Sequence, residues 1–122
     1  MIRGRVDGLQ ARVGVTFRIV GQPNVEIECV VNTGFEGALA LPRGAVLAMG
    51  LPYLTELDGN LADDTNVPVD VHVGTVVWNG IERDVAVHAM GRRPLPGTAL
   101  LDGLHLGADF VDGGLVTIDP SE

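Results

Sequence analysis

The amino-acid sequence predicts the all-β fold class: one mostly β domain over residues 1–122 with two short helices. The chain is long enough for one core, and 46% of its residues are hydrophobic while 20% are charged, which argues against disorder. Aromatic residues account for only 4%, so aliphatic side chains must form the core, and abundant valine favours strands. Alternating runs recur between turn residues at a spacing typical of a barrel-like or folded sheet.

The first two strands are predicted from their alternation. From Leu9 to Ile19 the odd positions are apolar and the even positions are polar or glycine, the period of a strand with one buried face. Residues 21–24 supply a turn. Alternation resumes from Val25 to Val31, so we expect a hairpin in which Cys29 is buried as a small apolar residue.

A short strand and a helix are expected next. Leu39–Leu41 is predicted to be a buried strand, and Pro42 can open a helix because the first turn does not need its N–H. Gly50 is expected to end that helix. The apolar positions of the helix are Val46, Leu47 and Met49.

The centre of the chain predicts two hairpins. Tyr53–Leu57 and the alternating run Val67–Val73 are expected to form a long hairpin, with turns at Asp58-Gly59 and at residues 63–66. Asn79-Gly80 gives the strongest hairpin signal, since both residues tolerate positive φ. It joins the predicted strands Val76–Trp78 and Ile81–Val87.

The C-terminal part is expected to hold the second helix and a last hairpin. Pro94–Gly97 interrupts the strand pattern, and the next residue can cap a short helix over Thr98–Leu101. Leu104–Phe110 is predicted to pair with Leu115–Ile118 across a glycine-rich turn.

Charge and cysteine content exclude several classes of partner. The formal net charge of -8 opposes binding to a phosphate backbone, so no nucleic acid is expected as a partner. No window approaches the ~18 apolar residues that span a bilayer, and no apolar leader is visible at the start, so we expect neither a membrane partner nor export. The lone Cys29 cannot form an internal disulfide, which favours a cytoplasmic location.

No cofactor and no metal site are predicted. His72, His88 and His105 fall on separate strands without the spacing of metal ligands, and they are interpreted as surface or edge residues. Phosphate-cradling glycine loops and dinucleotide fingerprints do not occur in the sequence. Cys29 is interpreted as a core residue rather than a nucleophile, because it lies within an alternating apolar strand.

Four stretches carry a family resemblance that covers nearly the whole chain. The first is Val31–Phe35 (Val-Asn-Thr-Gly-Phe) with Leu39–Pro42, and the others are Leu61–Asp64, Val76–Gly80, and Leu95–Gly103 with the Gly-Gly hairpin that follows. In this order they resemble the single-domain, retropepsin-like aspartic peptidases of clan AA, specifically the small bacterial branch.

The resemblance implies a fold, a reaction and a set of site residues. The fold would be a barrel or folded sheet with a flap hairpin and one lobe per chain. The activity would be that of an aspartic endopeptidase, in which two carboxylates at a homodimer axis activate a water for attack on a peptide or protein substrate. The catalytic triplet would be Asn32, Thr33 and Gly34, and the substrate-binding residues would be Phe35, Glu36, Gly37, Leu61, Ala62, Asp63, Asp64, Thr65, Leu95, Pro96 and Gly97.

Three positions depart from the family pattern: Asn32 replaces the catalytic Asp, Asp64 replaces a glycine and Pro96 replaces a leucine. Asn32 cannot act as a base, because its amide nitrogen has no available lone pair, so this chain is expected to be inactive as written. Deliberate inactivation of a peptidase and a natural pseudopeptidase that binds peptides both fit this residue. A structural β domain that dimerises through its termini without a ligand is the third hypothesis.

Overall fold

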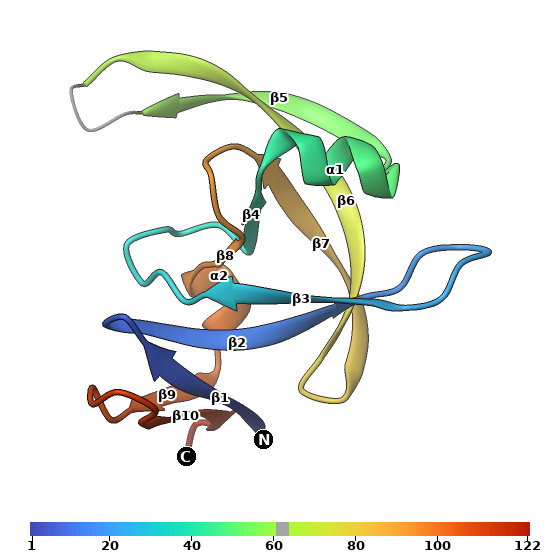
Figure 1. Ribbon diagram of the computed structural model, residues 1–122. Coiled ribbons are helices and arrows are strands. Elements are labelled where there is room, and N and C mark those ends of the chain that lie inside the picture. Colours follow the sequence, from blue (N-terminus) through green and yellow to red (C-terminus); the bar gives the residue numbers. More distant parts are fainter. Residues whose placement is uncertain (61–63) are drawn as a thin grey trace.

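The computed structural model describes residues 1–60 and 64–122, and it confirms a mostly β chain with two short helices (Figure 1). The helices are α1 (Arg43–Met49) and α2 (Thr98–Leu101). Neither of these described helices has the length and apolar character needed to cross a membrane. The strands are β1 (Ile2–Asp7), β2 (Gln10–Phe17), β3 (Val25–Val30), β4 (Leu39–Leu41), β5 (Tyr53–Asn60), β6 (Asn66–Trp78), β7 (Ile81–Ala89), β8 (Leu95–Pro96), β9 (Leu104–Ala108) and β10 (Leu115–Pro120).

The described strands form one sheet in the order β8-β4-β7-β6-β2-β1-β10-β9, with β3 added to β2 and β5 added to β6. β4 and β7 pair in parallel, which requires a long crossover, and α1, β5 and β6 supply it. Within the described ranges the end strands β8 and β9 do not pair, so the sheet is open rather than a closed barrel. β8 has only two residues, and Pro96 has no N–H to donate to a further strand.

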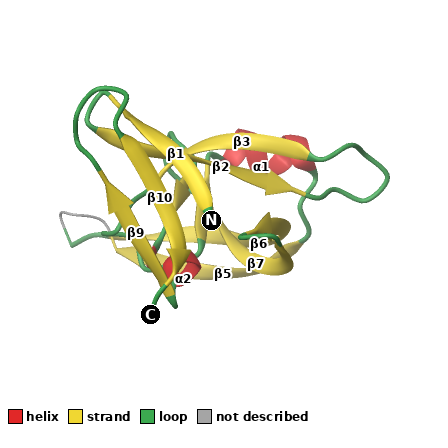
Figure 2. Cartoon of the chain, turned by 90° about the horizontal axis from the view of Figure 1, so that it is seen from below, coloured by secondary structure: helices red, strands yellow, loops and turns green. Residues whose placement is uncertain are grey.

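The folded sheet surrounds one core. Figure 1 shows β5 and the adjoining part of β6 at one end of the molecule, β1, β9 and β10 at the other, and β2 and β3 between them. The view from below in Figure 2 shows β1, β9 and β10 crossing over the strands of the other end. Core side chains come from β1, β2, β3, β4, β6, β7, β10 and both helices.

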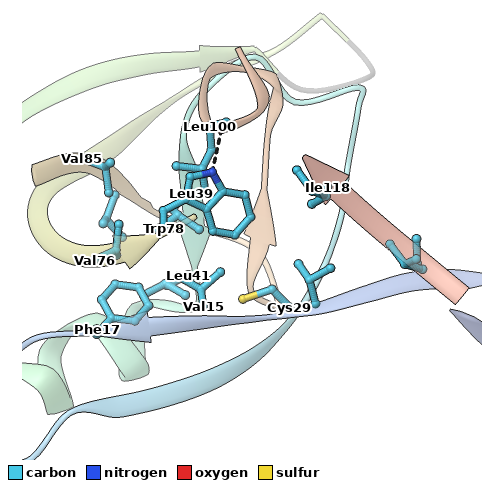
Figure 3. Close-up of a cluster of buried hydrophobic side chains, with 14 of the residues drawn as sticks. Val15, Phe17, Cys29, Leu39, Leu41, Val76, Trp78, Val85, Leu100 and Ile118 are labelled. Atoms are coloured by element: carbon cyan, nitrogen blue, oxygen red, sulfur yellow. Dashed lines mark hydrogen bonds between the residues drawn. The ribbon is translucent and has the colours of Figure 1, made fainter. Parts of the chain in front are cut away.

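Aliphatic side chains together with Phe17, Cys29 and Trp78 fill the centre of this core (Figure 3). The odd positions of β2 are buried as predicted, with Val15 and Phe17 both at 0% exposure. Trp78 is 3% exposed, and its indole Nε1 donates a hydrogen bond of 3.0 Å to the carbonyl of Leu100. This bond satisfies the buried indole N–H and ties β6 to α2.

The predicted hairpins and the first helix form where expected. β2 pairs antiparallel with β3, and β9 with β10. Asn79 and Gly80 join β6 to β7 with φ angles of 52° and 75°, as a type I′ turn requires. Pro42 precedes α1, and Gly50 ends it at a φ of 65°. Of the apolar positions of this helix, Val46 is buried and Leu47 is 60% exposed.

The turn predicted at Asp58-Gly59 is wrong. Both residues continue β5, and Gly59 pairs with Val67 of β6. A methyl group on Gly59 would lie 2.8 Å from Cγ2 of Val69. The glycine therefore permits close packing within the strand, and the pairing of β5 with β6 continues to Asn60.

The sequence pattern missed β1 and placed the start of β2 too early. β1 alternates poorly, yet it is held on both sides by β2 and β10. A side chain on Gly4 would collide with the carbonyl oxygen of Arg12, so the glycine allows the two strands to approach. Leu9, expected in the strand, lies in the turn before it at a φ of 65°.

Cys29 is buried, as predicted, at 0% exposure. Desolvation by burial, with a smaller contribution from the charge of Glu28, raises the pKa of the thiol from 9.0 to about 12. The thiol is therefore protonated and unreactive at neutral pH in the folded chain.

Stability should fall in alkaline solution through Cys29. Below about pH 9 both states hold the thiol proton, whereas above it the unfolded chain ionises first and the folded chain does not until its raised pKa is reached. We expect the urea-unfolding free energy to fall more steeply from about pH 9 to about pH 11 than in Cys29→Ala, which keeps every other titrating group. Equal slopes in the two proteins would contradict this assignment.

Candidate functional site

Asn32 begins a tight turn one residue after β3, which ends at Val30. Its backbone N–H donates to the carbonyl of Pro96 at 3.0 Å, and its own carbonyl accepts from the N–H of Phe35 at 3.2 Å. Its side-chain Oδ1 accepts a 2.9 Å hydrogen bond from the N–H of Gly34. Asn32 thus stabilises its own turn through the side-chain oxygen, the bonding pattern that makes Asn and Asp common at turns.

The segment after β8 is hydrogen-bonded to the loop that follows Asn32. The N–H of Thr98 donates to the carbonyl of Phe35 at 2.8 Å, and the N–H of Gly97 donates to Ala38 at 3.0 Å. The Thr98 hydroxyl also donates to the Phe35 carbonyl, at 3.3 Å. Thr98 was expected to cap α2, but the cap position is Gly97; the hydroxyl instead binds the loop, which lies within its reach.

Gly97 is the point where the two segments come closest. A methyl group there would collide with the carbonyl oxygens of Phe35 and Gly37, and would lie 2.6 Å from Cδ2 of the Phe35 ring. Its φ of -108° is ordinary for any residue. The position needs glycine for space and not for conformational freedom.

Phe35 and His88 cover the far side of the loop. The two rings meet edge to face with centroids 5.3 Å apart, and a methyl group on Gly37 would lie 3.0 Å from Cε1 of the His88 ring. Nδ1 of His88 is buried and has no hydrogen-bond partner among the described residues. The expectation that His88 is a plain surface residue is therefore wrong, because the parallel pairing of β4 and β7 brings it against the loop.

His72 also departs from its expected surface position. It is 9% exposed, and its Nδ1 lies 2.9 Å from the carbonyl of Leu51. A carbonyl oxygen only accepts hydrogen bonds, so Nδ1 carries the proton. His72 thereby connects β6 to the residues just before β5. Its ring also meets the Tyr53 ring edge to face, with centroids 5.5 Å apart.

The remaining residues of the loop face solvent. Thr33, Gly34 and Glu36 are exposed, and Glu36 is the one ionisable residue between positions 32 and 37. Thr33 also lines a surface groove of about 450 Å³ formed with β2, β3, β9 and the turn after β9. Among the described residues no group of three or more His, Cys, Asp or Glu is arranged to hold a metal ion.

The structure brings together two of the three predicted substrate-binding segments. Residues 35–37 and 95–97 are in direct contact, as described above. Leu61, Ala62 and Asp63 lie outside the described residues. Asp64, at a φ of 64°, and Thr65 are exposed beside them. The adjoining ends of β5 and β6 point to the same side of the molecule as the Asn32 loop (Figure 1).

Comparison with known proteins gives no relative: no protein-family model, no curated protein and no solved structure matches this chain.

Sequence reasoning missed His88 and the Thr98 hydroxyl as parts of this site. Alternation along β7 could place His88 on one face of a strand, but no local sequence pattern predicts that β7 pairs with β4. The glycines at 37 and 97 were the available signal, since glycine at a position without positive φ often marks a close approach of two backbones.

Replacing Gly97 by alanine should destabilise the protein strongly. The added methyl group would displace the carbonyl oxygens of Phe35 and Gly37, and we expect a loss of about 3 kcal/mol or more. Gly44→Ala is the matched control, because Gly44 lies in α1 and a methyl group there meets no atom within 4 Å. That control should gain about 1 kcal/mol from helix propensity. Urea unfolding measures both, and similar effects in the two variants would refute the close approach at Gly97.

Proposed function

We propose that this chain is a retropepsin-like aspartic endopeptidase subunit whose catalytic carboxylate position is occupied by Asn32, so that the protein as written does not hydrolyse peptides. The turn around Asn32 carries the proposal. It presents a side chain of the size and shape of aspartate at the end of an apolar strand, fixed by its Oδ1 bond to Gly34 and by the backbone bond to Pro96.

An aspartate would fit this turn without rearrangement. The side-chain atom that accepts the Gly34 N–H is an oxygen, and a carboxylate oxygen accepts the same bond. The second carboxylate oxygen would stand where the amide nitrogen of Asn32 now stands. It could then hold or release a proton, which the amide cannot do.

The reaction requires two such groups. One carboxylate takes a proton from water while the other, protonated, donates a hydrogen bond to the peptide carbonyl, so the pair shares one proton. The chain has a single Asn-Thr-Gly loop, and so the second group must come from a second copy related by a two-fold axis.

A peptide substrate would lie between this loop and the β5–β6 hairpin. Residues 35–37 and 95–97 would form its floor, and residues 61–65 would cover it as the flap implied by the sequence resemblance. The exposed Glu36 is placed to contact a substrate's polar or basic groups. His88, whose ring meets that of Phe35 edge to face, would support this floor.

A natural pseudopeptidase is the second candidate. It is favoured by the intact geometry of the turn, since the bonds that shape it survive with an amide at position 32. In this case the chain would bind an extended peptide in the same cleft and release it uncut.

Asn32→Asp is the direct test of hydrolysis. We expect the variant to cleave an unfolded protein substrate at acidic to neutral pH at a rate at least ~10² above the chain as written, since acid–base groups contribute about 10²–10⁴ each. Asn32→Ala is the matched control. Alanine cannot act as a base, so this variant should show no hydrolysis of the substrate. An inactive Asn32→Asp protein that still binds the peptide would favour the pseudopeptidase instead.

The same variant should acquire a pH-dependent dimer. Two facing carboxylates disfavour double ionisation, so the pKa of one of them is raised in the dimer. Its contribution to association is present at low pH and is lost as pH rises through that raised pKa. We expect the dimer of Asn32→Asp to weaken from acidic to neutral pH while Asn32 protein shows no such trend. Parallel melting profiles across pH for both proteins would count against this arrangement.

A further inference from the structure

A row of arginines crosses the outer face of the sheet. Arg5 of β1 lies directly opposite Arg12 of β2, and Arg12 lies opposite Val30 of β3. Directly paired residues of antiparallel strands project to the same face, and the buried positions of β2 are on the other one. The N–H of Val30 donates to the carbonyl of Pro94 at 2.9 Å, which brings the neighbouring Arg93 to the end of the row.

This gathering of arginines is unfavourable on its own. Like charges directly opposite one another destabilise a pair of strands. Among the described residues, neither Arg5 nor Arg93 has an ion-pair partner. The chain has 16 acidic and 8 basic residues, so a shortage of carboxylates does not explain why these two arginines are unpaired.

Arg12 has partners, but its guanidinium group is poorly satisfied. Its Nη1 lies 3.4 Å from Oε1 of Glu28 and 3.7 Å from Oδ2 of Asp7, whereas a charge-assisted hydrogen bond of this kind measures roughly 2.7–2.9 Å. Its Nη2 donates a 3.0 Å bond to Gln10. Its Nε is buried and has no hydrogen-bond partner in the described part of the chain. A buried donor without an acceptor is costly, so Arg12 would gain from a better acceptor.

Arg12 and Arg93 line one small hollow, which we call the Arg93 hollow. Its volume is about 260 Å³, and the lining residues are Arg12, Glu28, Val30, Arg93 and Pro94. Sites that bury drug-sized ligands measure roughly 300–1,000 Å³. The Arg93 hollow therefore has room for a small molecule only.

Charge distinguishes the Arg93 hollow from its neighbour. A second hollow of about 180 Å³ is lined by Arg12 together with Arg5, but Glu26 and Glu28 line it as well. Its two arginines are balanced by two carboxylates. The Arg93 hollow has two arginines and one carboxylate, so an anion is favoured there.

We propose that the Arg93 hollow binds a small oxyanion, either a carboxylate or a phosphate group, through the guanidinium groups of Arg12 and Arg93. Guanidinium presents its donors in a planar fork that matches two oxygens of such a group. A rotation of the Arg12 guanidinium would bring Nε and one Nη to the same anion. The net charge of -8 opposes a polyanion, whose further charges would meet the surrounding carboxylates.

Glu28 is the internal competitor for this anion. Its side chain is 57% exposed and lies 3.4 Å from Arg12. Exposed ion pairs of this kind contribute little to stability. An incoming oxyanion can therefore displace Glu28 from Arg12 without disturbing the strand.

The first test titrates the full chain with inorganic phosphate at constant ionic strength and follows the arginine Nε–Hε and backbone amide signals by NMR. We expect saturable shifts at Arg12 and Arg93. Arg93→Gln should weaken binding about 10-fold or more, because it removes charged hydrogen bonds. Arg83→Gln is the matched control, since Arg83 is also exposed, changes the net charge equally and does not line the hollow. Equal weakening by the two substitutions, or shifts that do not saturate, would overturn the proposal.

Glu28→Gln gives a test in the opposite direction, which misfolding cannot imitate. Removing the competing carboxylate should tighten phosphate binding about 3-fold or more. Glu26→Gln is the control, because it changes the net charge equally but lines only the neighbouring hollow. Weaker binding in Glu28→Gln, or the same tightening in both variants, would show that Glu28 does not compete at this site, and the proposal would fail.

Separate titrations with acetate and phosphate distinguish the two forms of the ligand. Tighter binding of acetate identifies a planar carboxylate, and tighter binding of phosphate identifies a phosphate group; either result supports the site. Chloride over the same concentration range should leave the signals in place. If chloride displaces phosphate at equal concentration, the hollow only attracts counter-ions and the proposal fails. No residue of the Asn32 turn takes part, so these outcomes are independent of the peptidase assignment.

Discussion

The close packing of two backbone segments determines the shape of the candidate site. The backbone N–H groups of residues 97–99 donate hydrogen bonds of 2.8 to 3.3 Å to carbonyls of residues 35–38. The two segments approach this closely because Gly97 has no side chain. The turn at Asn32 rests on these bonds and on the one from Asn32 to Pro96. The two segments are far apart in sequence, so the site exists only when the whole sheet has formed.

Because backbone groups make most of these bonds, the turn depends little on the chemistry of the side chain at position 32. The bond that the Asn32 side chain makes within it is accepted by an oxygen, which asparagine and aspartate share. Geometry and reactivity are therefore separable at this site. The scaffold can persist with an amide, while proton transfer requires a carboxylate.

The other unusual features of the chain gather around the same loop. An uncharged groove borders Thr33 in a strongly acidic protein, and its rim holds an exposed leucine at positive φ. On the other side, Nδ1 of His88 is buried beside Phe35 and has no hydrogen-bond partner in the described part of the chain. Each feature lowers the stability of a lone chain, and strain of this kind collects at functional surfaces.

The sequence alone determined the local structure wherever a pattern involves neighbouring residues. Alternation along β2, the Asn79-Gly80 turn and the helix between Pro42 and Gly50 were all predictable, because period and turn chemistry act over a few residues. The Asn32 turn was predictable for the same reason. β1 was not predictable, because its two neighbouring strands stabilise it and its own sequence lacks a clear alternation.

Tertiary structure alone decided which residues meet. The parallel pairing of β4 and β7 brings His88 to Phe35, and Thr98 donates to Phe35 across 63 positions of sequence. The strand through Gly59, read as a turn from its composition, is imposed by pairing with β6. Contacts at such separations depend on the order of strands in the sheet, and no periodicity in the chain encodes that order.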